Sequence, residues 1–449
     1  MGLLKRVSLP GLFWSKGGGN TPVKIERISE LDLQRLTRKS YGDDEKLERQ
    51  VAGILRKVRE EGDEALYQLT EEFDEVDLRE CGLQVTSQEW AEAYEQVDKE
   101  YLEAIREARK NILCFHEKQK RTSWLEPAED GSLLGQLLRP LQRVGIYVPG
   151  GTASYPSSVL MNALPAVVAG VEEIVMVSPP GKDGKLLPEV LVAAAEAGVN
   201  EVYKIGGAQS IAALAYGTKQ ISSVDKITGP GNIYVTLAKK QVFGLVDIDM
   251  LAGPSEILIL ADESADPAEL AADLLSQAEH DRLASAILVS PERDLLEETI
   301  IQVECQLATL PRAEIARSSW ENYGAVILVS DLEEGMALAN IIAPEHFELV
   351  VNDPVAWLGR VRNAGAVFLG RFSPEPVGDY FAGPNHVLPT GGTARFYSPL
   401  NVDTFVKKIN VVGYSQEALE KDAAKIALLA RREGLEAHAR AVEVRFDEN

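Results

Sequence analysis

The chain has 449 residues, of which 45% are hydrophobic and 26% are charged, a composition typical of a globular protein with more than one domain. Its 46 Lys and Arg against 69 Asp and Glu give a net charge of −23. This charge argues against nucleic acid or an anionic membrane as the main partner, because both are polyanions. The three cysteines lie far apart without a CxxC motif, so we expect neither a disulfide framework nor a thiolate metal site, and we expect a cytoplasmic protein.

The N-terminal part of the chain predicts an extension and then helices. Residues 1–20 contain basic residues but lack the apolar core of a secretory signal, so we interpret them as a loose extension. A short helical segment is expected over 21–40. Amphipathic, charge-rich patterns predict long helices over 43–74 and 86–120, and a capping box of Thr86 and Glu89 opens the second of these.

From residue 144 onward, short apolar runs alternate with helical patterns, which predicts βαβ units and parallel sheets. The first series of strands is expected at 145–148, 173–178, 201–207 and 224–229, with helices near 157–169, 187–198, 208–217 and 232–242. The second series of strands is expected at 256–262, 285–290, 324–330, 347–351 and 364–370. The pattern therefore predicts two α/β domains in tandem.

Beyond the last of these strands, periodicity is lost. The Gly- and Pro-rich stretch 371–400 is a long loop, and loops of this length in compact domains are more often functional than idle. Residues 401–449 predict a short segment and a helix from about 415 to 441. No apolar stretch is long enough to span a membrane, since the most apolar one, 160–171, has only 12 residues.

Two of the five histidines belong to patterns that suit metal or proton chemistry. Gln277 and His280 are three residues apart on a predicted helix, so both could reach one metal ion, although a satisfied polar helix end is the simpler interpretation. Glu345 and His346 are adjacent at a helix-to-strand junction and could activate water and transfer protons. His116 lies in a charged helix and is expected at the surface.

The other two histidines lie further along the chain. Asp379 and His386 share the 371–400 loop, where an Asp and a His often mark a site, but a turn-forming Asp beside a capping His would also explain them. Glu433 and His438 lie in the C-terminal helical pattern, where in isolation a surface role is favoured.

Three glycine-rich turns follow strands of the first series, at 148–158, 206–210 and 229–232. Such turns direct backbone N–H groups at anions, and helix N-termini add a partial positive charge, so a dinucleotide pyrophosphate would fit them. The sequence has no GxGxxG, HExxH, GxxxxGK[ST] or GxSxG motif. The residues alone therefore leave a dehydrogenase and a metal-dependent hydrolase both open.

The motifs YVPGG, GGAQSIAALAYGT, GPGN, AGPSE, SQAEHD, APEH, GDY-x4-NHVLPTGG and EGLxAH occur in this order. Together they resemble the histidinol dehydrogenase family from about residue 25 to the end of the chain. The resemblance implies an α/β fold with two tandem Rossmann-like parallel-sheet domains, small N- and C-terminal helical segments and an intertwined homodimer. It divides the chain into domains at 41–146 with 256–400 (catalytic and metal residues), 147–255 (NAD binding) and 401–449 (dimerisation).

The resemblance also implies an activity, cofactors and residue roles. The family oxidises L-histidinol to L-histidine through L-histidinal with two NAD+ and one Zn2+ per subunit. Glu345 and His346 match the catalytic pair, and His386 matches a histidine near the substrate. The remaining matches are zinc ligands at Gln277, His280, Asp379 and His438, which also line the substrate site; substrate contacts at Ser255, His346 and Glu433; and NAD contacts at Tyr147, Gln209 and Asn232.

The departures from the family pattern are few. Residues 1–20 have no counterpart, Arg282 stands where Pro is common, and Phe347 stands where Leu is common. Two alternatives remain: a dehydrogenase of the same fold for another alcohol, and a non-catalytic NAD- or metal-binding relative. The presence of Glu345 and His346 argues against the second, and the intact set of substrate-contact residues argues against the first.

Overall fold

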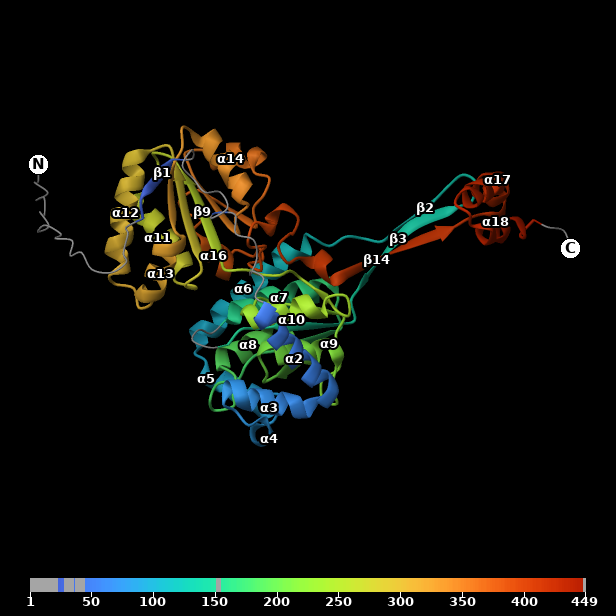
Figure 1. Ribbon diagram of the computed structural model, residues 1–449, viewed down its shortest axis with the longest axis horizontal. Helices are drawn as coiled ribbons and strands as arrows, with labels where there is room; N and C mark the ends of the chain where they lie inside the picture. The colour runs from blue at the N-terminus through green and yellow to red at the C-terminus, as the bar shows by residue number, and fades with distance from the viewer. Residues whose placement is uncertain (1–22, 28–35, 37–44, 151–154, 447–449) are drawn as a thin grey trace, which may run out of the picture.

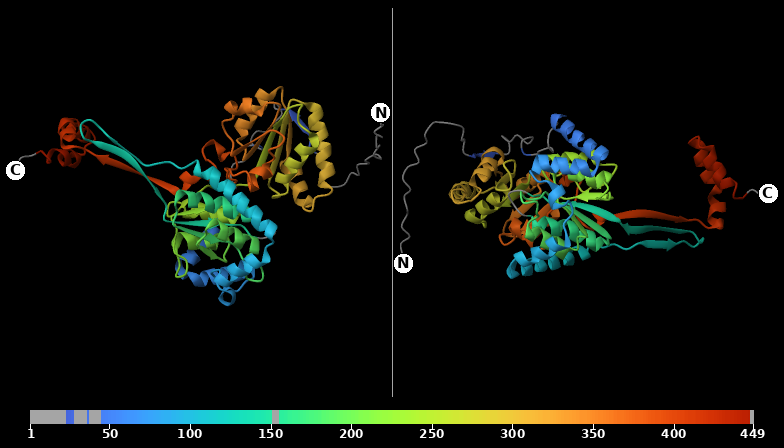
Figure 2. Two further views of the ribbon diagram at one scale, coloured as in Figure 1. Left: turned by 180° about the vertical axis from the view of Figure 1, so that it is seen from behind. Right: turned by 90° about the horizontal axis from the view of Figure 1, so that it is seen from below.

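A computed structural model describes residues 23–27, 36, 45–150 and 155–446 (Figure 1). It has two α/β domains and a long arm that projects away from them (Figures 1 and 2). Within the described residues, no helix is long and apolar enough to cross a membrane.

The first domain is built on a five-stranded parallel sheet in the order β6-β5-β4-β7-β8. Its strands are β4 (Arg143–Tyr147), β5 (Glu173–Val177), β6 (Glu201–Tyr203), β7 (Lys226–Thr228) and β8 (Asp247–Ile248). Helices α7 (Pro156–Ala169), α8 (Pro188–Ala197), α9 (Gly207–Tyr216) and α10 (Ile233–Val242) connect them. The predicted alternation of strands and helices is confirmed here.

The second domain is built on a six-stranded parallel sheet in the order β1-β11-β10-β9-β12-β13. Its strands are β1 (Ile25–Arg27), β9 (Glu256–Ala261), β10 (Ser285–Ser290), β11 (Ala325–Leu328), β12 (His346–Val350) and β13 (Ala366–Leu369). Its helices are α11 (Pro267–Ala278), α12 (Arg293–Leu307), α13 (Ala313–Tyr323), α14 (Leu332–Ile342), the single turn α15 (Pro354–Trp357) and α16 (Glu375–Tyr380). The five strands of the second predicted series are confirmed.

Two expectations about the N-terminal part are wrong. Residues 25–27 form an edge strand of the six-stranded sheet where we expected helix. Most of the remaining residues of 21–40, and the predicted extension 1–20, lie outside the described residues. The helices of 45–117 do not join the domain of 256–400. They pack on the helices that cover the five-stranded sheet, α7 to α10, and their apolar side chains belong to the two hydrophobic clusters of that domain. These helices are α2 (Glu45–Glu61), α3 (Asp63–Asp74), α4 (Leu78–Cys81), α5 (Ser87–Gln96) and α6 (Lys99–Glu117).

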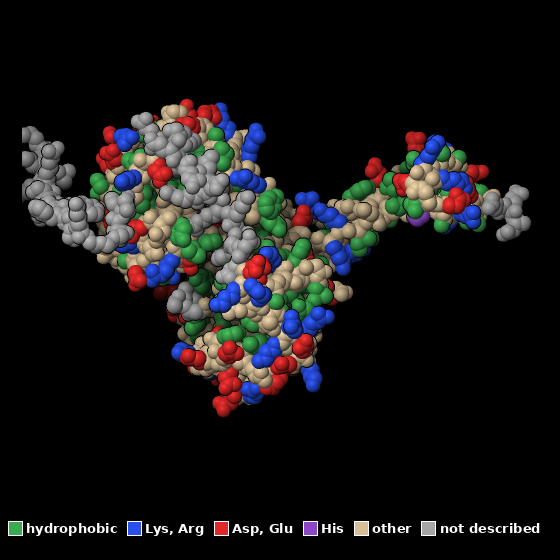
Figure 3. All heavy atoms as spheres, in the orientation of Figure 1, with side chains coloured by type: hydrophobic (Ala, Val, Ile, Leu, Met, Phe, Trp, Pro, Cys, Tyr) green, Lys and Arg blue, Asp and Glu red, His purple; other side chains and the backbone are tan. Residues whose placement is uncertain are grey.

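The arm is a three-stranded antiparallel sheet capped by two helices. It consists of β2 (Trp124–Pro127), β3 (Leu133–Pro140), β14 (Val406–Gly413), α17 (Gln416–Arg432) and α18 (Glu436–Glu443). The strands were not predicted, since the sequence analysis gave only a short segment before the C-terminal helix. The arm carries many exposed apolar side chains (Figure 3), among them Trp124, Leu134, Val412, Leu429 and Val444.

The predicted capping box at the start of α5 is confirmed. The Thr86 hydroxyl accepts a hydrogen bond from the Glu89 N–H at 3.2 Å, and the Glu89 carboxylate accepts one from the Thr86 N–H at 2.7 Å. Both bonds satisfy backbone N–H groups that the helix itself cannot satisfy.

Replacing Thr86 with Ala should weaken the first turn of α5. Loss of an N-cap costs about 1 kcal/mol, which is roughly a fivefold change in local opening. We expect amide hydrogen exchange in residues 87–90 to accelerate by about this factor. Thr86→Ser keeps the hydroxyl and should leave the exchange rate near that of the unmodified protein. Equal exchange in both variants would contradict a role for the cap.

Candidate active site

The predicted pair Glu345–His346 lies at the amino edge of the six-stranded sheet. Helix α14 ends at Ala343, which has a left-handed backbone (φ 56°), and Pro344 then leads the chain into β12. His346 is the first residue of β12 and pairs in register with Ile257 of the central strand β9. This position differs from the usual one in parallel sheets, where ligands bind at the carboxyl ends of the strands.

Backbone groups of Glu256 hold both side chains in place. The Glu345 Oε2 atom accepts a hydrogen bond from the Glu256 N–H at 2.9 Å, and His346 Nδ1 lies 3.1 Å from the Glu256 carbonyl oxygen. The Ser255 hydroxyl also hydrogen bonds to Glu345. A proton on His346 Nδ1 would be donated to that carbonyl, which leaves Nε2 free to face the rest of the site.

Helix α16 supplies two carboxylates opposite His346. The Nε2 atom of His346 lies 3.7 Å from Asp379 Oδ1 and 3.9 Å from Glu375 Oε1. The carboxylates are four residues apart, which places them on one face of the helix. Together with His280, which follows α11, they offer ligand atoms that all lie within 4.8 Å of one another. Nitrogen and oxygen donors so arranged suit a divalent metal ion.

Several buried polar atoms of this site have no hydrogen-bond partner among the described residues. They are both amide atoms of Gln277, Nε2 of His346 and Oε1 of Glu375. Gln277 is completely buried on the last turn of α11. Buried polar atoms in folded proteins nearly always have partners, so these atoms indicate space for a polar ligand or a cation.

The proton affinities of the pair reflect its burial and its charged neighbours. Burial raises the pKa of Glu345 to about 7. Burial alone would lower the pKa of His346, but the nearby carboxylates of Glu345, Asp379 and Glu375 raise it to about 10. Burial would raise the pKa of Asp379, yet the nearby imidazole rings of His346 and His386 hold that pKa below its ordinary value. Of these three groups, Glu345 therefore has the pKa closest to neutral pH, where a carboxyl group can both hold and release a proton.

His386 faces the same site from the loop after α16. Its Nδ1 atom lies 3.0 Å from the Asp379 carbonyl oxygen and 3.9 Å from Asp379 Oδ1. A cavity of about 480 Å³ lies beside Asp379 and His386. The sequence motifs that suggested a site in the 371–400 loop and at the ends of α11 and α14 therefore meet in space.

The acidic residues around this pair were not predicted from the sequence. Glu375 was not selected, although its spacing of four from Asp379 on a short helix could have identified it. Glu348, two residues after His346 on β12, accepts a hydrogen bond from the Glu375 N–H at 2.8 Å and hydrogen bonds to Asp273. Burial raises the pKa of both Glu348 and Asp273. Their role was hidden because it depends on packing between α11, β12 and α16.

The expectation that His116 lies at the surface is wrong. Its side chain is completely buried at the junction of the two domains. The Nδ1 atom lies 2.7 Å from Gln119 Oε1, and Nε2 lies 3.4 Å from the amide nitrogen of Asn385, which also donates to the Met161 carbonyl at 2.6 Å. The charged neighbours of His116 along the sequence lie on the other faces of α6.

Two predicted site residues do not reach this cluster within one chain. Glu433 and His438 are exposed at the tip of the arm, far from α11 and α16 (Figures 1 and 2). Both line a hollow between α17 and α18 together with apolar residues such as Leu429 and Leu435. The site that one chain builds therefore lacks two of the predicted residues.

The predicted dinucleotide turns follow β4, β6 and β7 at the carboxyl edge of the five-stranded sheet, except that residues 151–154 of the first turn lie outside the described residues. Tyr147 ends β4, and Gln209 lies in the first turn of α9. Asn232 caps α10 by accepting hydrogen bonds from the Tyr234 and Val235 N–H groups. The buried Tyr147 hydroxyl accepts a hydrogen bond from the Gly207 N–H at 3.4 Å, and burial raises its pKa to about 12. Strand order reverses between β4 and β7, so this edge is a topological switch point.

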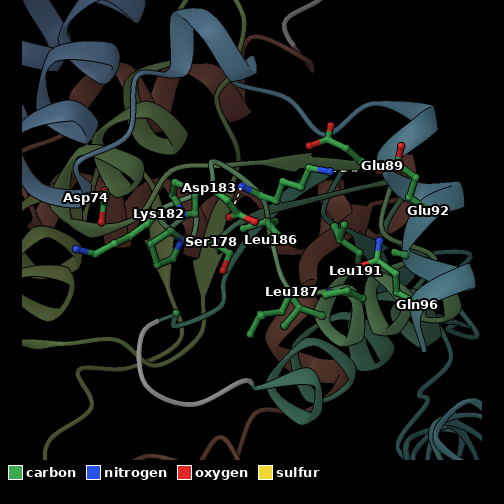
Figure 4. A pocket seen from close by; sticks show the side chains of 18 of the residues that line it. Asp74, Glu89, Glu92, Gln96, Ser178, Lys182, Asp183, Leu186, Leu187 and Leu191 are labelled. Atoms are coloured by element: carbon green, nitrogen blue, oxygen red, sulfur yellow. Dashed lines mark hydrogen bonds and ion pairs between the residues drawn. The ribbon is translucent and has the colours of Figure 1, made fainter. Parts of the chain in front are cut away.

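A cavity of about 440 Å³ adjoins the same edge (Figure 4). Residues that follow β4 and β5 line it, and Asp74, Glu89 and Glu92 approach from the helices around it (Figure 4). It does not include the Glu345–His346 cluster. The chain therefore has a cavity beside a topological switch point on one domain and an acid–base cluster on the other.

Comparisons with known proteins agree with this arrangement. A sequence model described as histidinol dehydrogenase matches residues 37–446. Histidinol dehydrogenase from Halalkalibacterium halodurans is 58% identical over 398 residues, covering 89% of this chain and 93% of the relative. The enzyme of that name from Heliobacterium mobile is 56% identical over 425 residues, covering 95% of this chain and 100% of the relative.

A solved structure gives the same result. The crystal structure of histidinol dehydrogenase from Elizabethkingia anophelis superposes with a TM-score of 0.88 at 38% identity, covering 94% of this chain and 96% of that one. The match extends over both domains and the arm, since only a small part of either chain is left out. On the sequence model, the identities and this structural match, the chain belongs to the histidinol dehydrogenase family of NAD-dependent oxidoreductases.

Proposed function

We propose that this protein oxidises L-histidinol to L-histidine through L-histidinal, reducing two NAD+ and using one Zn2+ per subunit, in the cytoplasm. The observation that carries the proposal is the buried cluster of Glu345, His346, Asp379 and His280 at the amino edge of the six-stranded sheet. The chain belongs to this family and also has a proposed dinucleotide edge on the other domain. An acid–base cluster and a bound dinucleotide together would support an oxidation that is coupled to proton transfer.

The residues present fit a zinc ion. His280 and Asp379 offer a nitrogen and an oxygen in one small volume, and the amide of the buried Gln277 has no partner among the described residues. His438 of a partner subunit would complete the proposed set. When bound, zinc would act as a Lewis acid and hold the amine and imidazole of the substrate. Glu375 lies within reach of the same ion, so we assign it to the surroundings of the metal.

His346 and Glu345 divide the proton transfers. The neighbouring carboxylates hold His346 protonated, and a cation bound beside Asp379 would offset them and release the Nε2 proton. In the first oxidation, the neutral His346 ring then takes the proton of the substrate hydroxyl through Nε2, while the Glu256 carbonyl fixes the ring at Nδ1. In the second, the Glu345 carboxylate takes a proton from the water that adds to the aldehyde. Burial of Glu345 makes it a stronger base than an exposed carboxylate, because the raised pKa increases its proton affinity. NAD+ accepts the hydride in both steps.

The active site is proposed to be shared between two subunits. Glu433 and His438 are exposed on an arm that carries many apolar side chains, and large exposed apolar surfaces mark interaction sites. If the arm of each chain packed on the two domains of the other chain, this apolar surface would be buried. Glu433 and His438 would then lie beside the partner's acid–base cluster. The homodimer would then be intertwined, with symmetric use of the same surfaces.

Removal of the metal tests the proposed zinc site. Strong chelation should abolish NADH formation from L-histidinol, and added Zn2+ should restore it. His280→Ala should lose bound zinc, measured by elemental analysis, because it removes a direct ligand. Glu345→Gln, which changes no proposed ligand, is the matched control and should retain zinc. Full activity in a verified metal-free preparation would refute this assignment.

The roles of the catalytic pair can be separated by substrate. Glu345→Gln should slow oxidation of L-histidinal by about 10²–10⁴-fold, the usual contribution of a general acid or base. Oxidation of L-histidinol to the aldehyde should be slowed much less, since that step uses His346. Single-turnover NADH formation with each substrate measures the two rates. Small and equal losses in both steps would show that Glu345 does not activate the water.

The dinucleotide edge can be tested without disturbing the metal. Gln209→Ala and Asn232→Ser should each raise the KM for NAD+ while the zinc content stays the same. Serine at 232 still caps α10, so the helix is kept and only the longer amide is lost. Loss of zinc with unchanged NAD+ kinetics would be incompatible with NAD+ at this edge.

A further inference from the structure

A buried ion pair outside the proposed catalytic cluster contacts the GPGN turn at 229–232. Lys239 lies on α10 and Asp249 follows β8, and their ammonium and carboxylate groups are in direct contact. The side chains are 3% and 1% exposed, which makes this the most buried ion pair found among the described residues. The mechanism proposed above gives it no role.

Both members of the pair bond to the backbone of Gly229. The Asp249 Oδ2 atom accepts a hydrogen bond from the Gly229 N–H at 2.8 Å, and the Lys239 ammonium donates to the Gly229 carbonyl at 3.0 Å. The second Asp249 oxygen also accepts a hydrogen bond from the Met250 N–H at 2.6 Å. The pair therefore fixes the orientation of the peptide groups on both sides of Gly229.

Gly229 needs this support because of its conformation and its place in the sheet. Its φ of 107° is rarely adopted by other residues, and a Cβ atom there would lie 2.1 Å from the Tyr147 carbonyl oxygen. Strands β7 and β8 have only three and two residues, so few ladder bonds hold this end of the sheet. Three residues later, Asn232 begins α10. A change at Gly229 would thus move Asn232 and the helix N-terminus together.

The chemistry of the pair favours positioning over stability. A buried ion pair often contributes little net stability compared with apolar residues of similar size, because both charges lose their hydration. The hydrogen bonds from Lys239 and Asp249 to the Gly229 backbone, however, are directional, and both contact the turn 229–232. We propose that Lys239 and Asp249 are positioning residues for NAD+, holding the turn 229–232 in the geometry that receives the dinucleotide. This inference rests on the proposed NAD+ site.

The test replaces the pair without leaving a charge buried alone. Lys239→Met/Asp249→Leu keeps the volume apolar, so the double variant should fold. We expect its KM for NAD+ and its dissociation constant for NADH to rise roughly ten- to a hundredfold, as with other residues that orient a binding group. The kcat at saturating NAD+, the zinc content and the affinity for L-histidinol should change little.

A matched control removes an ion pair from the opposite edge of the same sheet. Arg143 and Glu201 begin β4 and β6 and contact one another at 2.6 Å. Arg143→Met/Glu201→Gln should lower stability without changing NAD+ binding. If the Lys239/Asp249 double variant changes only the unfolding temperature and keeps the original KM for NAD+, the pair is purely structural and the inference is wrong.

Two further variants keep the inference testable if the double variant does not fold. Lys239→Gln/Asp249→Asn buries no charge and offers one acceptor oxygen in place of two at position 249, and it should raise the KM for NAD+ by a smaller factor. An unchanged KM in this folded variant would overturn the proposal. Gln209→Ala is measured in parallel: if it too leaves NAD+ binding unchanged, the proposed NAD+ site itself is wrong, whereas a raised KM in Gln209→Ala alone rejects only the positioning role.

Discussion

Buried charge at the amino edge of the six-stranded sheet is the constraint on which this structure depends. Glu345, Glu375 and Asp379 surround His346 in a volume that is largely shielded from water. One imidazolium cannot balance three carboxylates, and isolated buried charges are costly. The raised pKa of Glu345 and of Glu375 reflects this cost. A divalent cation would remove most of it, and one of these carboxylates, Asp379, is a proposed zinc ligand, while Glu375 lies beside the proposed metal position.

The need to satisfy the buried polar groups of the cluster also gives the arm a role. Helices α11 and α16 leave both amide atoms of Gln277 and one oxygen of Glu375 without a hydrogen-bond partner among the described residues. The proposed ligand His438 lies far from them, at the end of the arm. The arm also exposes apolar residues such as Trp124 and Val412, which a second chain could cover. Assembly and metal binding would then be linked, because each would complete what the other requires.

The sequence predicted the regular parts of the fold and most of the acid–base cluster. Strands such as 256–261 are continuous apolar runs that are buried on both faces, and such runs are clear without a structure. Gln277 was selected by its helical spacing from His280, and Asp379 by its place in the 371–400 loop, whereas Ser255 was selected only because it belongs to a family motif. The position of the cluster at the amino edge of the sheet was not predicted, since it depends on which ends of the strands the loops bring together.

Features that arise from packing between distant segments were missed. Strands β3 and β14 are more than 260 residues apart and pair only because both leave the same domain. His116 was misplaced, because its burial depends on Asn385 of the other domain. Glu375 lacked a motif, and its importance comes from its proximity to His346. For β14 and His116 the contact partner lies too far along the sequence for periodicity or spacing to reveal it, whereas the spacing of Glu375 from Asp379 was a signal that could have been used.

The central claim is that each active site combines the cluster of one chain with the arm of another. It is tested most directly by a purified mixed dimer of a Glu345→Ala chain and a His438→Ala chain, separated from the parent dimers by distinct tags. One of its two sites would carry both changes and the other neither, so about half of the unmodified activity is expected for a symmetric dimer. A mixed dimer as inactive as both parents would mean that His438 serves its own chain, which would contradict the account.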